Sequence, residues 1–313
     1  GWQGAFRSRD VFGPYEERIV LAQGSTDVNG PHQGAWVRAA DGSDWFLHVQ
    51  QRGAYGRVVH LQPMRWDEEG WPVMGDDGEP VAVHARPAAA HPRAHPGAPA
   101  PAASPVVPDA DDDFPGGRFG RQWSWLANPG PGWTTVHSDD GLWLDCRRTA
   151  DAHDLRRLTN VLVQRLPGRP CTAEVELRLD SGEAGAKAGL AVLGDAFCWI
   201  GLERDASGVR LVHRFAESAA EHERDAARPR PAPDGRARLR VEILPGARCH
   251  FSARTGEDPA FQSSGPPFAA TALAGAPHAG GQGRAGAQLG LFATAPPGGG
   301  PAGTAAFTGF RVT

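Results

Sequence analysis

Apolar and polar residues alternate along most of the second half of the chain. Residues 172–180 alternate Val, Leu and Leu with Glu, Glu and Arg, and residues 236–244 repeat the pattern. A period of two places one set of side chains on a buried face of a strand and the other set in solvent. Similar runs predict further strands at 141–146, 160–166, 188–193, 197–204, 209–215, 288–294 and 305–312. This succession of strands indicates a β-sandwich of the jelly-roll type over residues 114–313.

Residues 1–84 also predict strands, but shorter ones. The runs lie at 18–21, 35–37, 45–49 and 58–61, with Asp41-Gly42 as a hairpin turn between the second and the third. Three or four strands in about 40 residues have the size of one propeller blade. No helical period of useful length occurs, and residues 219–227, which come nearest to one, predict a loop or a single turn. The fold class we expect is therefore all-β.

A segment rich in proline and alanine separates these two regions. Residues 85–113 predict an extended linker, with seven Pro and nine Ala in positions 85–108. His91 and His95 lack a third ligand at a fixed spacing, so we assign them no metal site. The acidic residues at 109–113 could bind calcium, but a solvated end of the linker is the simpler interpretation.

Charge and composition exclude several classes of function. Lys and Arg number 32 against 36 Asp and Glu, for a formal net charge of −4, which gives no reason to expect nucleic acid as a partner. Apolar runs are no longer than strands, so no membrane span is expected. The chain begins at Gly1 without Met, so we expect it to be cut, and its localisation stays open between extracellular, periplasmic and cytoplasmic.

The cysteines of the chain are isolated from one another. Cys146, Cys171, Cys198 and Cys249 show none of the spacings that bind zinc. Buried free thiols are the expected state, and one or two disulfides stay open as the alternative in a secreted protein.

Two segments of the first region carry a resemblance to a known family. Residues 29–37 read NGPHQGAWV and residues 45–63 read WFLHVQQRGAYGRVVHLQP. Together they resemble the last blade of the five-bladed propellers of glycoside hydrolase family 43. FGPY at 12–15 resembles the end of the preceding blade, and WPVM at 71–74 with GEP at 78–80 resembles the tail that closes the domain. The resemblance implies a partial propeller over residues 1–84.

The second region resembles another part of the same enzymes. FGRQWSW at 119–125, LVQR at 162–165 and AGLAVL at 188–193 resemble the concanavalin-A-like C-terminal domain of family 43 β-xylosidases. Five tryptophans of this region, Trp123, Trp125, Trp133, Trp143 and Trp199, are expected mostly in the core because of their strand positions.

The resemblance implies a hydrolase of β-xylosides or α-L-arabinofuranosides of plant polysaccharide, acting with inversion. Galactan or arabinan hydrolysis is the other chemistry it admits. Inversion needs two carboxyl groups, one as general base and one as general acid with a raised pKa. The family takes these groups and a pKa-tuning Asp from the first three blades, which this chain lacks, so we expect a fragment with no catalytic residue of its own. Asp10, Glu16, Glu17 and Asp27 are expected to be ordinary solvated carboxylates.

Three residues are expected to bind substrate. His32 matches the family histidine on the propeller axis, which in some relatives holds a water shell or a calcium ion. Arg52 matches an arginine that reaches the sugar hydroxyls or the acid–base pair, and Tyr55 has a ring that suits stacking on a sugar. For Trp36 core packing is favoured over stacking. The resemblance requires no cofactor, leaves calcium open with His32 as an indirect ligand, and implies xylo- or arabino-oligosaccharide as the partner.

A second hypothesis comes from a different class of protein. The sandwich would serve as a non-catalytic carbohydrate-binding or structural module that works without the absent blades. A lectin-like fold alone does not establish lectin function, so binding of xylan would be needed to support this hypothesis. The oligomeric state is not readable from the sequence.

Overall fold

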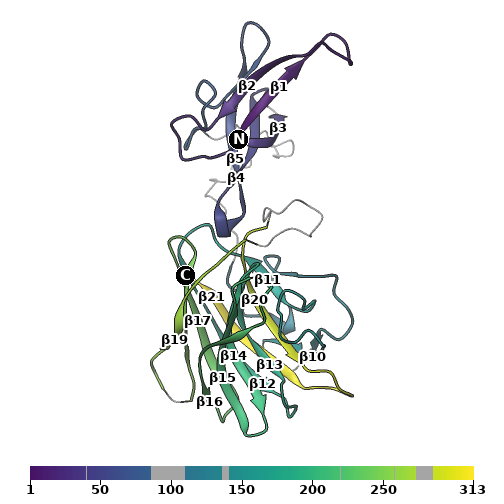
Figure 1. The fold of residues 1–313 in the computed structure, drawn as a ribbon, viewed down its shortest axis with the longest axis vertical. Coiled ribbons are helices and arrows are strands. Elements are labelled where there is room, and N and C mark those ends of the chain that lie inside the picture. The colour runs from purple at the N-terminus through teal and green to yellow at the C-terminus, as the bar shows by residue number, and fades with distance from the viewer. Residues whose placement is uncertain (40, 86–109, 136–140, 219, 257, 273–284) are drawn as a thin grey trace, which may run out of the picture. The chain divides into compact units, whose positions relative to one another are not determined.

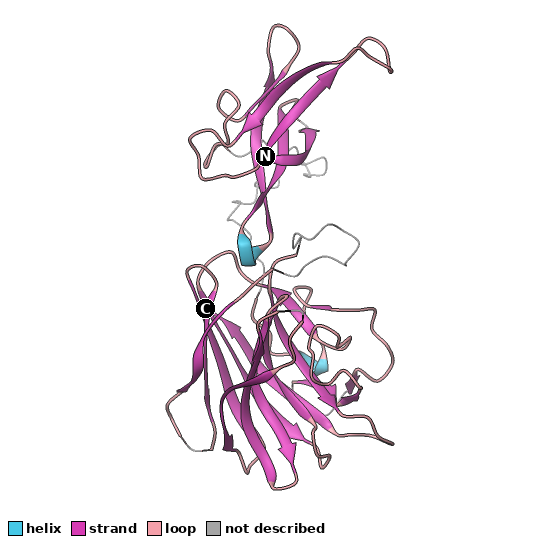
Figure 2. Ribbon diagram, viewed as in Figure 1, coloured by secondary structure: helices cyan, strands magenta, loops and turns pink. Residues whose placement is uncertain are grey.

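The computed structural model describes residues 1–39, 41–85, 110–135, 141–218, 220–256, 258–272 and 285–313 (Figure 1). Strands make up almost all of its regular structure (Figure 2), and the described residues contain only two short 3-10 helices, η1(Gly53–Tyr55) and η2(Pro115–Gly117). The prediction of an all-β chain is confirmed. Contacts divide the chain into a first unit, Gly1–Arg52 with Arg57–Val106, and a second unit, Gly53–Gly56 with Val107–Thr313.

The first unit holds a hairpin and a four-stranded antiparallel sheet. The hairpin pairs β1(Trp2–Arg7) with β2(Glu16–Ala22). The sheet has the strand order β3-β4-β5-β6, the arrangement of one propeller blade. Gly42 has a φ of 86° and donates its N–H to Ala39 at 3.0 Å, so the predicted turn joins the first two strands. The four strands of the sheet are β3(His32–Arg38), β4(Asp44–Gln51), β5(Arg57–Trp66) and β6(Pro72–Met74).

A small apolar cluster holds the first unit together, and many large apolar side chains stay outside it. The cluster consists of Val20, Leu21, Phe46, Met64 and Met74, all buried. Exposed apolar residues include Trp2, Phe6, Phe12, Ile19, Trp36 and Val59. The sequence places more apolar side chains on this unit than its own sheets can cover.

The second unit is a sandwich of two large sheets. The eight-stranded sheet has the order β16-β15-β14-β13-β20-β11-β7, with β10 paired to β20. Its strands are β7(Ser124–Trp125), β10(Arg147–Arg148), β11(Leu162–Arg165), β13(Lys187–Leu193), β14(Phe197–Asp205), β15(Gly208–Ala216), β16(Arg224–Pro231) and β20(Gln288–Ala295). The seven-stranded sheet has the order β19-β18-β17-β12-β21-β9-β8. Its strands are β8(Thr134–Thr135), β9(Leu142–Asp145), β12(Cys171–Asp180), β17(Arg236–Leu244), β18(Arg248–Arg254), β19(Gln262–Ala269) and β21(Thr304–Val312).

The core of the second unit lies between the two sheets, as the alternation predicts. In β12 the side chains of Val175, Leu177 and Leu179 are buried, while Glu176 on the other face is exposed. The expectation that most of the tryptophans lie in the core is confirmed, because Trp123 and Trp199 belong to buried apolar clusters and Trp125 packs against one of them. Trp133 and Trp143 are buried outside these clusters. All four cysteines are buried free thiols.

The residues at 219–227 correct one prediction. They were expected to form a loop or a single turn, but β16 begins at Arg224 and pairs with β15. β16 carries two prolines and so does β19, and each strand is the last of its sheet. Proline lacks an N–H and is tolerated on an edge strand, where no further partner needs the bond. Because both strands contain proline and lack the alternation of apolar and polar residues, the sequence pattern does not predict them.

The acidic run before the sandwich is structural in the part that the structure describes. Asp112 is buried, pairs with Phe310 of β21, and accepts hydrogen bonds from Gly120 N at 2.7 Å and Trp123 Nε1 at 3.0 Å. Asp113 pairs with Arg311. The solvated end expected for this run is therefore wrong for Asp112. Asp109, His91, His95 and the linker from 86 to 109 lie outside the described residues.

Candidate functional site

Two strands of the first unit place a row of imidazoles and amides on one buried face. The register sets His48 of β4 opposite His60 of β5, and the two rings stack with centroids 5.1 Å apart. The Nε2 atom of Gln62 lies 3.2 Å from the Nε2 atom of His48, and both side chains are almost fully buried. Gln50 lies 3.0 Å from His60 through its Oε1 atom and also donates to Asp27 O at 2.7 Å. These polar side chains support one another inside the sheet.

Burial sets the protonation of this row. Burial is the main cause that lowers the pKa of His48, and the nearby His60 and His32 add to it. The pKa of His60 is also lowered, again mainly by burial and further by the charge of Arg52. Both rings are therefore neutral at pH 7, and they serve as hydrogen-bonding groups.

His32 lies at the start of β3, opposite Val49 of β4. Its ring is half-buried, and Nδ1 contacts the carbonyl oxygen of Gly30. Gly30 has a φ of 51°, which glycine adopts without strain, so the Gly-Pro-His turn aims the ring toward its own backbone. The second ring nitrogen forms no hydrogen bond with a residue that the structure describes.

Arg52 follows the end of β4 and is exposed. Its guanidinium makes no hydrogen bond or ion pair with the residues that the structure describes. It lies on the same sheet as His32, and each acts electrostatically on the buried histidines. The structure thus places these two sequence-predicted residues at one group of imidazoles.

Tyr55 belongs to the other unit. It lies in η1 and packs against the core of the sandwich. Ala54 O accepts a hydrogen bond from Ala287 N at 2.6 Å, and a Cβ on Gly56 would lie 2.3 Å from Gly286 N. The Gly-Ala-Tyr-Gly segment thus has a packing role within the second unit, and sugar stacking by Tyr55 stays a prediction.

The structure adds residues that the sequence reasoning missed. Arg57 at the start of β5 donates from Nη1 to Gln33 Oε1 at 2.8 Å, beside His32 in the chain. The His48 and His60 pair was also missed. Its signal in the sequence is a period of two in which polar residues share the buried positions with apolar ones, His48 and Gln50 with Phe46 in β4, and Gln62 with Met64 in β5.

Trp36 corrects a further expectation. Core packing was favoured, but Trp36 is 52% exposed. Its Nε1 donates to Asp44 at 2.9 Å and its ring meets Trp66 edge to face at 5.2 Å. The physical reason is that β3 is an edge strand whose residues are mostly exposed.

Calcium prefers carboxylate and carbonyl oxygens, and the described contact of the His32 ring is the carbonyl oxygen of Gly30. A calcium ion held indirectly by His32 stays a prediction. In the described part of the chain, no group of three or more His, Cys, Asp or Glu side chains could hold a metal ion. The described helices also include none that is long and apolar enough to cross a membrane.

Comparison with known proteins decides the family. Residues 111–313 match the beta xylosidase C-terminal concanavalin A-like domain, and residues 2–72 match glycosyl hydrolases family 43. The chain belongs to this family. The partial propeller and the concanavalin-A-like sandwich that the motifs implied are thereby confirmed as family 43 regions.

Curated family 43 relatives extend well beyond the region shared with this chain. A putative beta-xylosidase of Xylanibacter ruminicola is 40% identical over 213 residues, covering 66% of this chain and 37% of the relative. A beta-xylosidase of Formosa agariphila is 29% identical over 240 residues, covering 66% of this chain and 38% of the relative. The chain therefore spans less than two fifths of the curated family members it matches.

Solved structures agree on the fold. A xylan beta-1,4-xylosidase from Bacillus halodurans has a TM-score of 0.79 at 18% identity, covering 98% of this chain and 59% of that chain. At this identity the likeness to the solved structure supports the fold alone.

Proposed function

We propose that this family 43 chain contributes to a glycoside hydrolase that removes terminal β-xylosyl or α-L-arabinofuranosyl residues from plant polysaccharide with inversion. The observation that carries the proposal is the 40% identity to a putative beta-xylosidase over 213 residues. We also propose that the catalytic carboxyl groups come from sequence other than these 313 residues. The chain's short span relative to its curated relatives supports this second part.

The carboxyl groups of the first unit support that division. An inverting general acid needs a raised pKa. Hydrogen bonds from Arg38 and Trp36 instead lower the pKa of Asp44. The pKa of Asp67 is lowered mainly by the backbone N–H of Trp71, and that of Glu79 by Ser25. These three carboxylates are stabilised in the ionised form, so they suit structural roles.

The exposed apolar side chains of the first unit support the same proposal. Trp2, Phe6 and Ile19 on the hairpin are each more than half exposed. Large exposed apolar patches mark surfaces that contact another part of a protein. Further propeller blades are the natural cover for a single blade, because blades pack face to face around a ring.

Within this proposal His32 and Arg52 serve the sugar subsite. The guanidinium of Arg52, which has no partner among the described residues, suits two neighbouring hydroxyls or a carboxylate. His32 holds one ring nitrogen against Gly30 O and offers the other to water or to a hydroxyl. Tyr55 remains a candidate for stacking. No step of the proposed chemistry passes through a metal ion.

The reaction outcome tests the proposal. The protein expressed from its native locus should hydrolyse aryl β-D-xyloside or aryl α-L-arabinofuranoside, and proton NMR at early times should show the inverted anomer as first product. A retained anomer would contradict the mechanism. Hydrolysis of neither glycoside, together with binding of xylo-oligosaccharide by this chain, would favour the non-catalytic carbohydrate-binding module instead.

A further inference from the structure

A groove of about 480 Å³ lies on the outer face of the seven-stranded sheet. It is on the opposite side of this sheet from the core, since its charged residues alternate with the buried Leu177 along β12. The register sets Trp143 of β9 beside Ala306 of β21, and Ala306 beside Arg178 of β12. The small residue Ala306 thus lies between Trp143 and Arg178 across the strands of this face.

The register places arginines directly opposite one another in this groove. Arg178 of β12 faces Arg236 of β17, and Arg238 of β17 faces Arg254 of β18. Like charges in opposed cross-strand positions destabilise a sheet. Glu174 and Glu176 neutralise Arg238, so the unfavourable pair is Arg178 with Arg236, unless an anion lies between these two side chains.

The next row of the same sheet face has the ordinary solution. Glu174 lies 3.0 Å from Arg238 and 2.6 Å from Arg240, so one carboxylate neutralises two guanidinium groups. In this row the sheet itself provides the carboxylate that neutralises its arginines, as expected for arginines with a purely structural role.

Three arginines of the groove lack such a partner among the described residues. Arg178, Arg236 and Arg254 form no ion pair with any residue that the structure describes. The Nε atom of Arg178 is buried and has no hydrogen-bond partner there, while its guanidinium lies 4.6 Å from the centre of the Trp143 ring. Stacking on the indole fixes the orientation of this guanidinium, and its donors have no partner among the residues that the structure describes.

We propose that the groove binds a carboxylate-bearing sugar, a uronic acid unit, whose carboxylate lies between Arg178 and Arg236. The planar guanidinium fork matches a carboxylate with two parallel hydrogen bonds. Glu176, Asp234 and Asp258 also line the groove. They disfavour a polyanion, but they accept hydrogen bonds from sugar hydroxyls. A ligand with one negative charge and several hydroxyls satisfies both sets of groups.

This inference does not depend on the proposed hydrolase activity. Every residue of the groove belongs to the second unit, and binding requires no catalytic carboxyl group. A failure of hydrolysis would leave it intact, and a failure of binding would leave the hydrolase proposal intact.

Isothermal titration of the 313-residue chain with D-glucuronate, D-glucose and sodium sulfate tests the proposal. Glucuronate should bind at least about tenfold more tightly than glucose, because a hydrogen bond to a charged group is worth about one power of ten in affinity. Arg236→Gln should lose at least about tenfold of the glucuronate affinity. Arg240→Gln, on the same strand and face but paired with Glu174, is the matched control and should retain it.

Thermal unfolding provides a second measurement that separates binding from folding. Without ligand, Arg236→Gln should unfold at the same temperature as the wild type or higher, since it removes an opposed like-charge pair. Glucuronate should raise the unfolding temperature of the wild type and of Arg240→Gln, but not that of Arg236→Gln. Equal affinity for glucuronate and glucose, or unchanged binding by Arg236→Gln, would overturn the proposal. Sulfate that binds as tightly as glucuronate with the same dependence on Arg236 would overturn the sugar assignment.

Discussion

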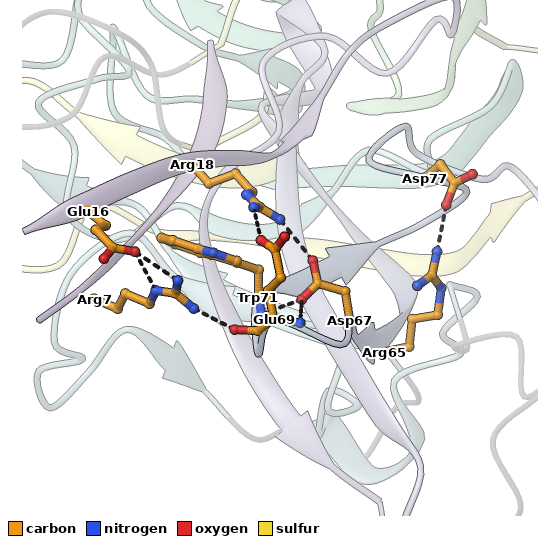
Figure 3. A network of polar contacts seen from close by, with 8 residues as sticks. All are labelled: Arg7, Glu16, Arg18, Arg65, Asp67, Glu69, Trp71 and Asp77. Carbon is orange, nitrogen blue, oxygen red and sulfur yellow. Dashed lines mark hydrogen bonds and ion pairs between the residues drawn. The ribbon is translucent and has the colours of Figure 1, made fainter.

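The guanidinium carbon of Arg7 lies 4.1 Å from the centre of the Trp71 ring, and that of Arg18 lies 4.8 Å from it (Figure 3). The arginines come from the two strands of the hairpin, whereas Trp71 immediately precedes β6 of the four-stranded sheet. Ion pairs surround the indole, with Arg18 bound to Asp67 and to Glu69 at 2.8 Å each. One buried indole therefore joins the hairpin to the sheet.

Loss of that indole should release the hairpin. Trp71 is only 4% exposed, so Trp71→Ala should destabilise the first unit by roughly 3 kcal/mol, the cost of a buried aromatic side chain. Amide hydrogen exchange should accelerate in β1 and β2 more than in the sandwich. Trp66→Ala, at a site that is 42% exposed, is the control and should have a smaller effect. Unchanged exchange in the hairpin of Trp71→Ala would show that the ion pairs suffice.

A buried charge pair should stabilise the second unit only as long as both partners remain. Lys187 contacts Glu223, and the side chains are 1% and 3% exposed. Glu223→Gln should cost about 3 kcal/mol in urea unfolding, because it leaves the lysine charge buried without its partner. The Lys187→Met, Glu223→Gln double variant should be more stable than Glu223→Gln alone. A double variant that loses the sum of both single effects would refute this coupling.

Much of the fold could be predicted because one physical pattern dominates it. Alternation located the buried strands of the sandwich, and the Asp41-Gly42 turn located the hairpin of the first sheet. Edge strands escaped prediction: β16 and β19 bury little and carry prolines, so neither alternation nor strand propensity marks them. The exposure of Trp36 could not be predicted either, because it depends on β3 being at the edge of its sheet.

The site was less predictable than the fold. His32 and Arg52 came from the resemblance, and the structure places them near His48 and His60, which no motif had indicated. The register of β4 against β5 creates that cluster, and the order of residues along each strand does not contain it. The opposed arginines of β12 and β17 escaped for the same reason.

One buried histidine should make stability depend on pH. Burial lowers the pKa of His213 from 6.5 to about 4, so the unfolded chain binds its proton more tightly than the folded one. The free energy of unfolding should therefore fall as the pH drops from about 6.5 toward 4, and it should level off below pH 4. This residue should account for roughly 2–3 kcal/mol of the decrease. Urea unfolding at pH 7.5 and pH 4.5 should show a loss larger by that amount in the wild type than in His213→Phe. Equal losses would contradict the assignment.

The two candidate subsite residues should affect catalysis in the protein expressed from its native locus. Arg52→Ala should lower kcat/KM on an aryl β-xyloside, and the decrease should correspond to a loss of roughly 2 kcal/mol or more of transition-state stabilisation. His32→Ala should also lower kcat/KM. Arg65→Ala removes an exposed arginine paired with Asp77 in the same unit and should have little effect. If Arg52→Ala and His32→Ala both keep the wild-type kcat/KM, the assignment is wrong.

The division of the active site between this chain and other sequence can be measured directly. The protein expressed from its native locus and these 313 residues alone should be assayed at equal concentration on p-nitrophenyl β-D-xyloside and p-nitrophenyl α-L-arabinofuranoside, with the intact mass of each determined. We predict that the native product hydrolyses one of these glycosides and that the 313 residues release no nitrophenol above the buffer rate. Turnover by the 313 residues at a rate comparable to the native product would contradict the account, because it would place the catalytic carboxyl groups within this chain.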